Sequence, residues 1–182
     1  NNILTIMKKI SPNPVSLAGK FAVLSQLALR GYDANMTFGR TKNVDILVSD
    51  PKTEKMYKLE VRTNYYFPDS DTVGESKNFS KYATDWIMDE KHENITDPKL
   101  FYCFVSFNES SYNTRFFIVP SMDVAKYVKG EFSSWLKAKK KEGGKGKNDD
   151  MRLFRIGVSG VKYDYIKTPT PEKYENNWEF KA

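Results

Sequence analysis

The sequence has little of what disulfides, membrane spans and histidine chemistry require. Among 182 residues, Cys103 is the one cysteine, so no internal disulfide can form and a reducing compartment, the cytoplasm, is expected. No apolar run approaches the roughly 18 residues of a membrane span, so we expect no membrane association. His92 is the one histidine, which excludes histidine-rich zinc sites and argues against a histidine triad. We expect His92 to be exposed within its charged run, and Cys103 to be a buried, inert thiol.

Positive charge is in excess. Lysine and arginine number 29 against 23 acidic residues, a net charge of +6, which favours a polyanionic partner such as nucleic acid. The length suits a single domain over residues 1–182 with a full hydrophobic core. The run 137–150 is rich in lysine and glycine and is expected to be a flexible basic loop. Its Lys139, Lys140 and Lys141 are candidates for contacts with the DNA backbone, the alternative being a solvated helix end.

Hydrophobic periodicity and turn residues predict the secondary structure. In chain order, the predicted elements are a helix from Leu17 capped by Ser16 and closed by Gly31, a strand over 32–38, a hairpin of Val44–Val48 and Tyr57–Val61, a helix over Ser80–Glu93, strands over Leu100–Phe107 and Arg115–Pro120, a helix capped by Ser121, and a strand over Met151–Ile156. The pattern favours an α/β domain with a central mixed sheet of about five strands flanked by helices.

Two carboxylates in the predicted hairpin have apolar neighbours on both sides. Asp45 lies inside the first strand, Glu60 lies inside the second, and Arg62 follows two residues later. A buried carboxylate is costly without a partner, and two side by side can hold Mg²⁺ or Mn²⁺, which activates water for phosphodiester hydrolysis. In the alternative interpretation, Asp45 caps a turn and Glu60 pairs with Arg62 or Lys58.

The stretch from Gly19 to Thr63 resembles the PD-(D/E)xK nuclease superfamily, which includes restriction endonucleases and Holliday-junction resolvases. In that family a helix ends in Gly-Tyr or Gly-Phe, a strand follows, and a hairpin carries an Asp and then Glu-x-Lys. Here the helix is expected to end at Gly31-Tyr32, and Asp45 and Glu60 match the acidic positions. The resemblance implies a restriction-endonuclease-like fold, DNA as substrate, Mg²⁺ or Mn²⁺ on Asp45 and Glu60, and a possible homodimer. It also places Arg40 and Lys42 near the same cleft.

Two cations depart from the family pattern. Arg62 stands where the family has lysine, and arginine keeps the charge but does not readily lose a proton. Lys20 stands on the first helix where many members carry a metal-binding glutamate. The sequence therefore leaves two functions open. One is a metal-dependent endonuclease in which Arg62 or Lys20 stabilises the transition-state charge. The other is a catalytically inactive module of nuclease fold that binds DNA or a partner protein.

Overall fold

The structure, a computed structural model, describes residues 12–37, 43–66, 79–108, 114–143, 150–158 and 165–182, so Arg40 and Lys42 lie outside the described residues. The elements, in chain order, are α1 (Pro12–Leu29), β1 (Asp33–Met36), β2 (Ile46–Ser49), β3 (Met56–Tyr66), β4 (Phe79–Asp89), the 3₁₀ helix η2 (Glu90–Asn94), β5 (Leu100–Asn108), β6 (Thr114–Pro120), α2 (Ser121–Lys141), β7 (Met151–Val158) and the 3₁₀ helix η4 (Pro171–Lys173).

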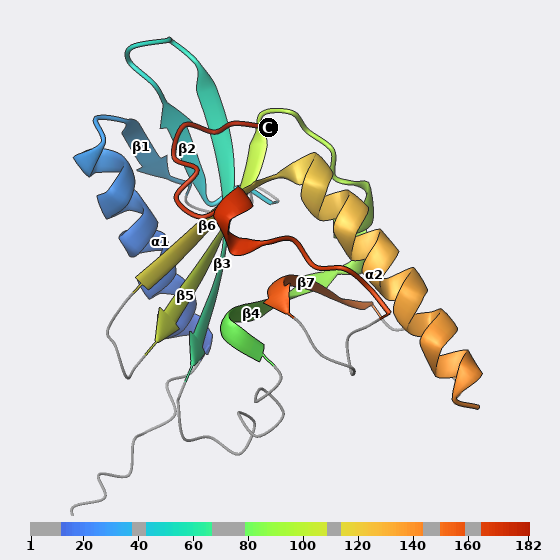
Figure 1. Cartoon of the computed structure of the whole chain (residues 1–182). Coiled ribbons are helices and arrows are strands. Elements are labelled where there is room, and N and C mark those ends of the chain that lie inside the picture. The colour runs from blue at the N-terminus through green and yellow to red at the C-terminus, as the bar shows by residue number, and fades with distance from the viewer. Residues whose placement is uncertain (1–11, 38–42, 67–78, 109–113, 144–149, 159–164) are drawn as a thin grey trace, which may run out of the picture.

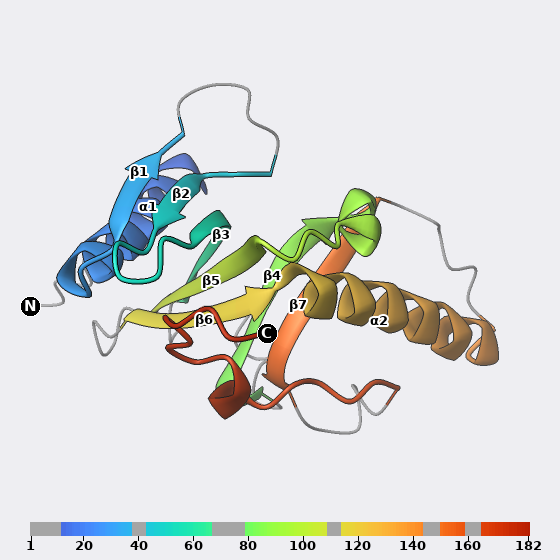
Figure 2. The same ribbon diagram turned by 90° about the horizontal axis from the view of Figure 1, so that it is seen from above.

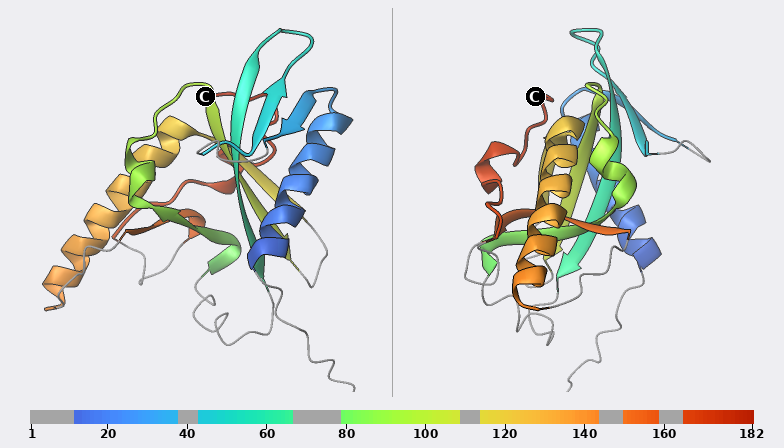
Figure 3. Two further views of the ribbon diagram at one scale, coloured as in Figure 1. Left: turned by 180° about the vertical axis from the view of Figure 1, so that it is seen from behind. Right: turned by 90° about the vertical axis from the view of Figure 1, so that its right-hand side faces the viewer.

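A five-stranded sheet in the order β1-β2-β3-β5-β6 forms the centre of the fold (Figure 1). The first three strands form an antiparallel meander, β3 and β5 are parallel, and β5 and β6 are antiparallel. Helix α1 lies on one side of this sheet, while α2 and the two-stranded β4–β7 sheet lie on the other (Figures 2 and 3). The predicted α/β class and mixed sheet of about five strands are therefore confirmed.

The alternation of side chains along β5 creates two hydrophobic cores. Phe101, Cys103 and Val105 pack with α1, while Tyr102 and Phe104 pack toward α2, β4 and β7. All five are buried, as expected of a strand covered on both faces. Cys103 is fully buried, as predicted, and this burial raises the pKa of its thiol.

The helix predicted over Ser80–Glu93 is wrong. The segment forms strand β4, which pairs antiparallel with β7, and only Glu90–Asn94 make a short 3₁₀ helix. Trp86 is buried and Ile87 is 65% exposed, the period of two that a strand requires. Pairing with a strand more than sixty residues away in sequence therefore overrode the local helical spacing.

Three helix ends differ from the sequence predictions. Helix α1 begins at Pro12 rather than after Ser16, because proline is tolerated in the first helical turn, where no intrahelical N–H bond is needed. Ser121 is not the cap of α2: Pro120 precedes the helix and the Ser121 hydroxyl donates to the Asp97 carbonyl at 2.6 Å. Residues 137–141, expected in a loop, belong to α2, and residues 144–149 lie outside the described part. The predicted cap at Gly31 is confirmed by its positive φ of 81°.

No helix in the described part of the chain is both long and apolar enough to cross a membrane.

Helix α1 approaches β3 closely at Gly19. A Cβ atom at Gly19 would lie 1.8 Å from the Thr63 hydroxyl and 2.9 Å from its Cβ, so Gly19→Ala is expected to destabilise the fold by about 1–3 kcal/mol through overpacking. Gly130→Ala in α2 is the matched control, because its Cβ would meet nothing within 4 Å and alanine favours a helix by up to about 1 kcal/mol. Urea unfolding of both variants measures the difference, and equal stability would contradict the close contact.

Candidate functional site

Asp45 lies one residue before strand β2, not inside it as the sequence predicts, at the end of the β2–β3 ladder. Ile46 and Leu59 form the first pair of the β2–β3 ladder, and the Asp45 amide donates to the Leu59 carbonyl at 2.7 Å. The Asp45 Oδ2 atom accepts the amide of Val61 at 2.8 Å. The carboxylate thus satisfies a β3 backbone donor at the point where backbone pairing with β2 stops.

Lys20 forms an ion pair with the other oxygen of the Asp45 carboxylate. Its Nζ atom lies 2.6 Å from Asp45 Oδ1, and both side chains are about one quarter exposed, 26% and 23%. Lys20 follows Gly19, whose close contact with β3 brings the helix near the strand. Both oxygens of Asp45 therefore already have a donor, one from the backbone and one from a cation of α1.

Glu60 lies on the opposite face of the sheet. Its neighbours Leu59 and Val61 pack in the core on the α1 side, so strand alternation directs Glu60 and Arg62 away from α1. Glu60 is 5% exposed, and its Oε1 atom accepts from Arg62 Nε at 3.0 Å and also from Arg62 Nη2. The Glu60–Arg62 pairing that the sequence offered as the alternative is present, and Lys58 instead pairs with Asp97.

His92 completes the Glu60 cluster, so the prediction that it is exposed is wrong. It is fully buried on η2, and its Nε2 atom lies 3.2 Å from Glu60 Oε1 and 3.1 Å from Arg62 Nη2. The Asp89 amide lies 3.0 Å from His92 Nδ1. When Nδ1 accepts this amide, the ring proton is on Nε2 and is donated to Glu60. The spacing Asp89-x-x-His92, a capping box at the start of η2, was the available sequence signal.

Tyr102 is a second residue that the sequence analysis missed. It lies directly opposite Glu60 in the β3–β5 register, and its ring meets the His92 ring edge-on with centroids 5.7 Å apart. Burial and the Glu60 charge raise the pKa of Tyr102, so the phenol stays protonated beside the carboxylate. A tyrosine within a mostly apolar strand was the available sequence signal.

The charges around Glu60 keep it ionised despite its burial. Burial alone would raise the pKa of Glu60, but the His92 hydrogen bond and the Arg62 charge outweigh it and lower the pKa. Glu60 is therefore a carboxylate at neutral pH, neutralised from within the protein.

This lowered pKa predicts a loss of stability in acid. As the pH falls below the ordinary glutamate value of about 4.3, the unfolded chain binds a proton before folded Glu60 does, so this contribution, present above that pH, is lost as the pH falls through the folded pKa. Urea unfolding between about pH 5 and 3 should show a steeper loss for the wild type than for Glu60→Gln, in which this group cannot titrate. Parallel curves would contradict the assignment.

The donor set at Asp45 and Glu60 does not fit Mg²⁺ or Mn²⁺. The partners of the two carboxylates come from opposite faces of the sheet, Lys20 from α1 and His92 from η2. In the described ranges, no group of three or more histidine, cysteine, aspartate or glutamate side chains is placed to hold a metal ion. Two cations already balance the two carboxylates, so a divalent ion would bring uncompensated positive charge.

The three candidate DNA-binding lysines lie apart from this centre. Lys139, Lys140 and Lys141 are exposed on the last turn of α2, at the end that projects away from the five-stranded sheet (Figure 1). Positive charge there also complements the helix dipole. The structure thus brings Lys20 to Asp45 and Arg62 to Glu60, and leaves the lysines of α2 on a separate surface.

Comparisons with known proteins give no family. No family model matches the chain, and no curated protein matches it. Among solved structures, that of the bacterial homing endonuclease I-Ssp6803I is similar at 11% sequence identity, over 93% of this chain and 89% of that one, with a TM-score of 0.49. A likeness of that size carries no argument about the site.

Proposed function

We propose that the chain is a nucleic-acid-binding module in which cationic side chains of the protein, rather than a catalytic metal, pair with the carboxylates of Asp45 and Glu60. Of the two functions that the sequence leaves open, this is the inactive module of nuclease fold. The observation that carries it is the pairing of Lys20 with Asp45 at 2.6 Å, at the position where the resemblance expects a metal-binding glutamate.

Two further features support the absence of a catalytic metal. Glu60 is held in a buried network with Arg62 and His92, and removing a buried carboxylate from such partners is costly. A guanidinium does not readily give up a proton, so Arg62 does not serve where a neutral amine is needed.

Nucleic acid is the proposed partner because positive charge is both in excess and exposed. The net charge is +6, and the last turn of α2 presents Lys139, Lys140 and Lys141 to solvent. Lysines on a helix end contact phosphates without reading sequence, so binding should be insensitive to base order and strongly salt-dependent.

Fluorescence anisotropy with labelled duplex DNA over a range of salt concentrations tests this proposal. Each lysine that neutralises a phosphate contributes about 0.9 to the slope of log K against log salt, so replacing Lys139, Lys140 and Lys141 by alanine should lower the slope by about 2–3. Lys52→Ala and Lys55→Ala, exposed in the β2–β3 turn, are the control. The proposal fails if no duplex or single-stranded DNA binds at low salt, or if the alanine variant keeps the wild-type slope.

A further inference from the structure

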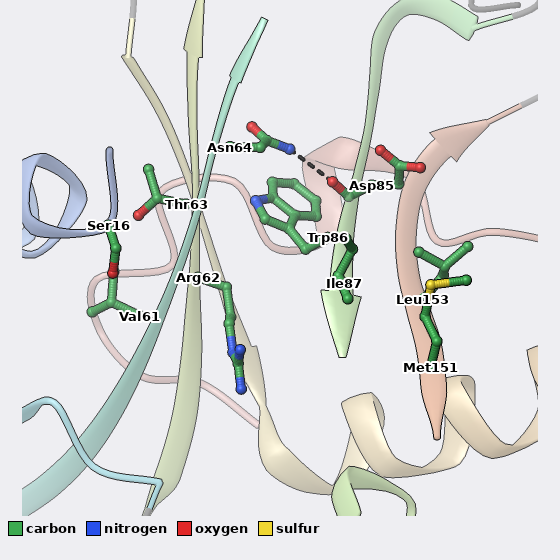
Figure 4. A pocket seen from close by; sticks show the side chains of 10 residues that line it. All are labelled: Ser16, Val61, Arg62, Thr63, Asn64, Asp85, Trp86, Ile87, Met151 and Leu153. Carbon is green, nitrogen blue, oxygen red and sulfur yellow. Dashed lines mark hydrogen bonds between the residues drawn. The ribbon is translucent and has the colours of Figure 1, made fainter. Parts of the chain in front are cut away.

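A cavity of about 560 Å³ opens beside the Glu60 cluster, between β3 and the β4–β7 sheet (Figure 4). Four consecutive β3 residues, 61–64, line it together with Ser16 of α1. Successive side chains of a strand point to opposite faces, so the cavity follows the edge of β3 rather than one face. Its volume is in the range of sites that bind small molecules.

One wall of the cavity offers hydrogen-bond donors. Glu60 accepts hydrogen bonds from Arg62 Nε and Nη2, which fix the orientation of the guanidinium. Within the described ranges, Arg62 Nη1 has no hydrogen-bond partner. The Val61 amide points away from β5 and is taken by Asp45, so two residues further the Thr63 amide points to the same edge. The pairing of β3 with β2 extends only to Leu59, and no described strand pairs with Thr63 on this edge of β3.

The opposite wall is mostly apolar and carries one acidic residue among those that line the cavity, Asp85 of β4, whose carbonyl accepts from Asn64 of β3 at 2.8 Å. Ile87 of β4 and Leu153 of β7 are directly paired, so they share one face of that sheet, and Met151 lies two residues from Leu153 on the same face. Ile87 is 65% exposed and Met151 50% exposed. A cluster of apolar side chains exposed beside a cavity marks a binding surface.

These two walls favour a ligand with one anionic group and one flat apolar part. An added peptide strand would need a row of free backbone groups, but the Val61 amide is already used by Asp45. A duplex surface carries many phosphates, whereas the cavity presents one guanidinium whose charge Glu60 partly offsets. One nucleotide matches this arrangement, with its phosphate at Arg62 and the Thr63 amide and its base on the apolar wall.

We propose that the cavity along the edge of β3 takes a single unpaired nucleotide of a nucleic-acid strand. This inference rests on the proposed nucleic-acid binding and names its target as nucleic acid that contains an unpaired base. The lysines of α2 would supply general affinity, while the cavity would supply the preference for an unpaired base.

The test compares a short duplex with the same duplex carrying one bulged 2-aminopurine, using the full-length chain. We expect about tenfold tighter binding of the bulged duplex, the effect of roughly one base contact, and a change in 2-aminopurine fluorescence on binding. Ile87→Asp should abolish this preference and leave duplex affinity within about twofold. Met56→Asp is the control, because Met56 is 59% exposed and lies outside the cavity, and it should keep the preference.

The outcomes separate this inference from the function on which it rests. Equal affinity for the bulged and perfect duplexes, with both bound, overturns the nucleotide site and leaves nucleic-acid binding intact. A preference for the bulged duplex that survives Ile87→Asp also overturns the nucleotide site, because the base then contacts another surface. Displacement of the bulged duplex by an extended peptide overturns it as well, because the edge of β3 then binds a peptide strand. Absence of binding to either DNA at low salt overturns the proposed function itself.

Discussion

Replacing Lys20 by glutamate is expected to turn a protein that is indifferent to divalent metals into one that Mn²⁺ or Mg²⁺ stabilises. In the wild type the Lys20 ammonium lies 2.6 Å from Asp45 Oδ1 and takes the place that a metal ion would have. Lys20→Glu removes this charge and adds carboxylate oxygens, which are preferred ligands of these metals. Metal at about a hundred times its dissociation constant should then raise the melting temperature by about 5–10 °C, measured by differential scanning fluorimetry.

Lys20→Gln is the matched control for this experiment. It also breaks the ion pair with Asp45 but adds no carboxylate, so its melting temperature should not respond to metal. If metal stabilised the wild type as much as it stabilises Lys20→Glu, Lys20 would not be the residue that keeps metal from Asp45. No metal response in a folded Lys20→Glu variant would show that Asp45 is not placed to share a cation.

Trp86→Ala is expected to cause the largest loss of stability, about 3–5 kcal/mol. Trp86 is 3% exposed and packs against Phe104 and Phe117, with ring centroids 4.9 and 5.8 Å apart. Its indole N–H donates to the Val105 carbonyl at 3.1 Å. The substitution therefore opens a large cavity between β4 and the central sheet and leaves a buried carbonyl without its donor.

The neighbouring Ile87→Ala is the control for this prediction. Ile87 is 65% exposed, so its truncation should change the free energy of unfolding by less than about 0.5 kcal/mol. If the segment were the helix that its spacing indicates, residues 86 and 87 would both face the core and both truncations would destabilise. Urea unfolding that gave similar large losses for Trp86→Ala and Ile87→Ala would contradict the strand.

Much of the central sheet follows from local sequence patterns. The hairpin of β2 and β3, the apolar strand β5 and the glycine at the end of α1 each show a signal within a few residues. The β4 segment does not, because Trp86 and Ile87 also fit a helical face. Only pairing with β7, at Ile87–Leu153 for example, selects the strand, and such a distant contact leaves no trace in local periodicity.

The same limit applies to the candidate site. The positions of Asp45 and Glu60 at the open end of the β2–β3 hairpin could be predicted to within a residue, and their different partners could not. His92 lies in a charged run, where exposure is the ordinary expectation, yet it is fully buried. Its position depends on Glu60, 32 residues earlier, and on Tyr102 of β5, contacts that form only when the sheet assembles.

The most direct test of a centre closed by its own cations is a cleavage assay with Mg²⁺ or Mn²⁺ on duplex, single-stranded and branched DNA, with binding measured in the same samples. With the cations Lys20 on Asp45 and Arg62 on Glu60, and with His92 hydrogen-bonded to Glu60, the DNA should be bound and recovered uncut with either metal. Metal-dependent cutting that Asp45→Ala abolishes would contradict this account and establish the chain as a nuclease.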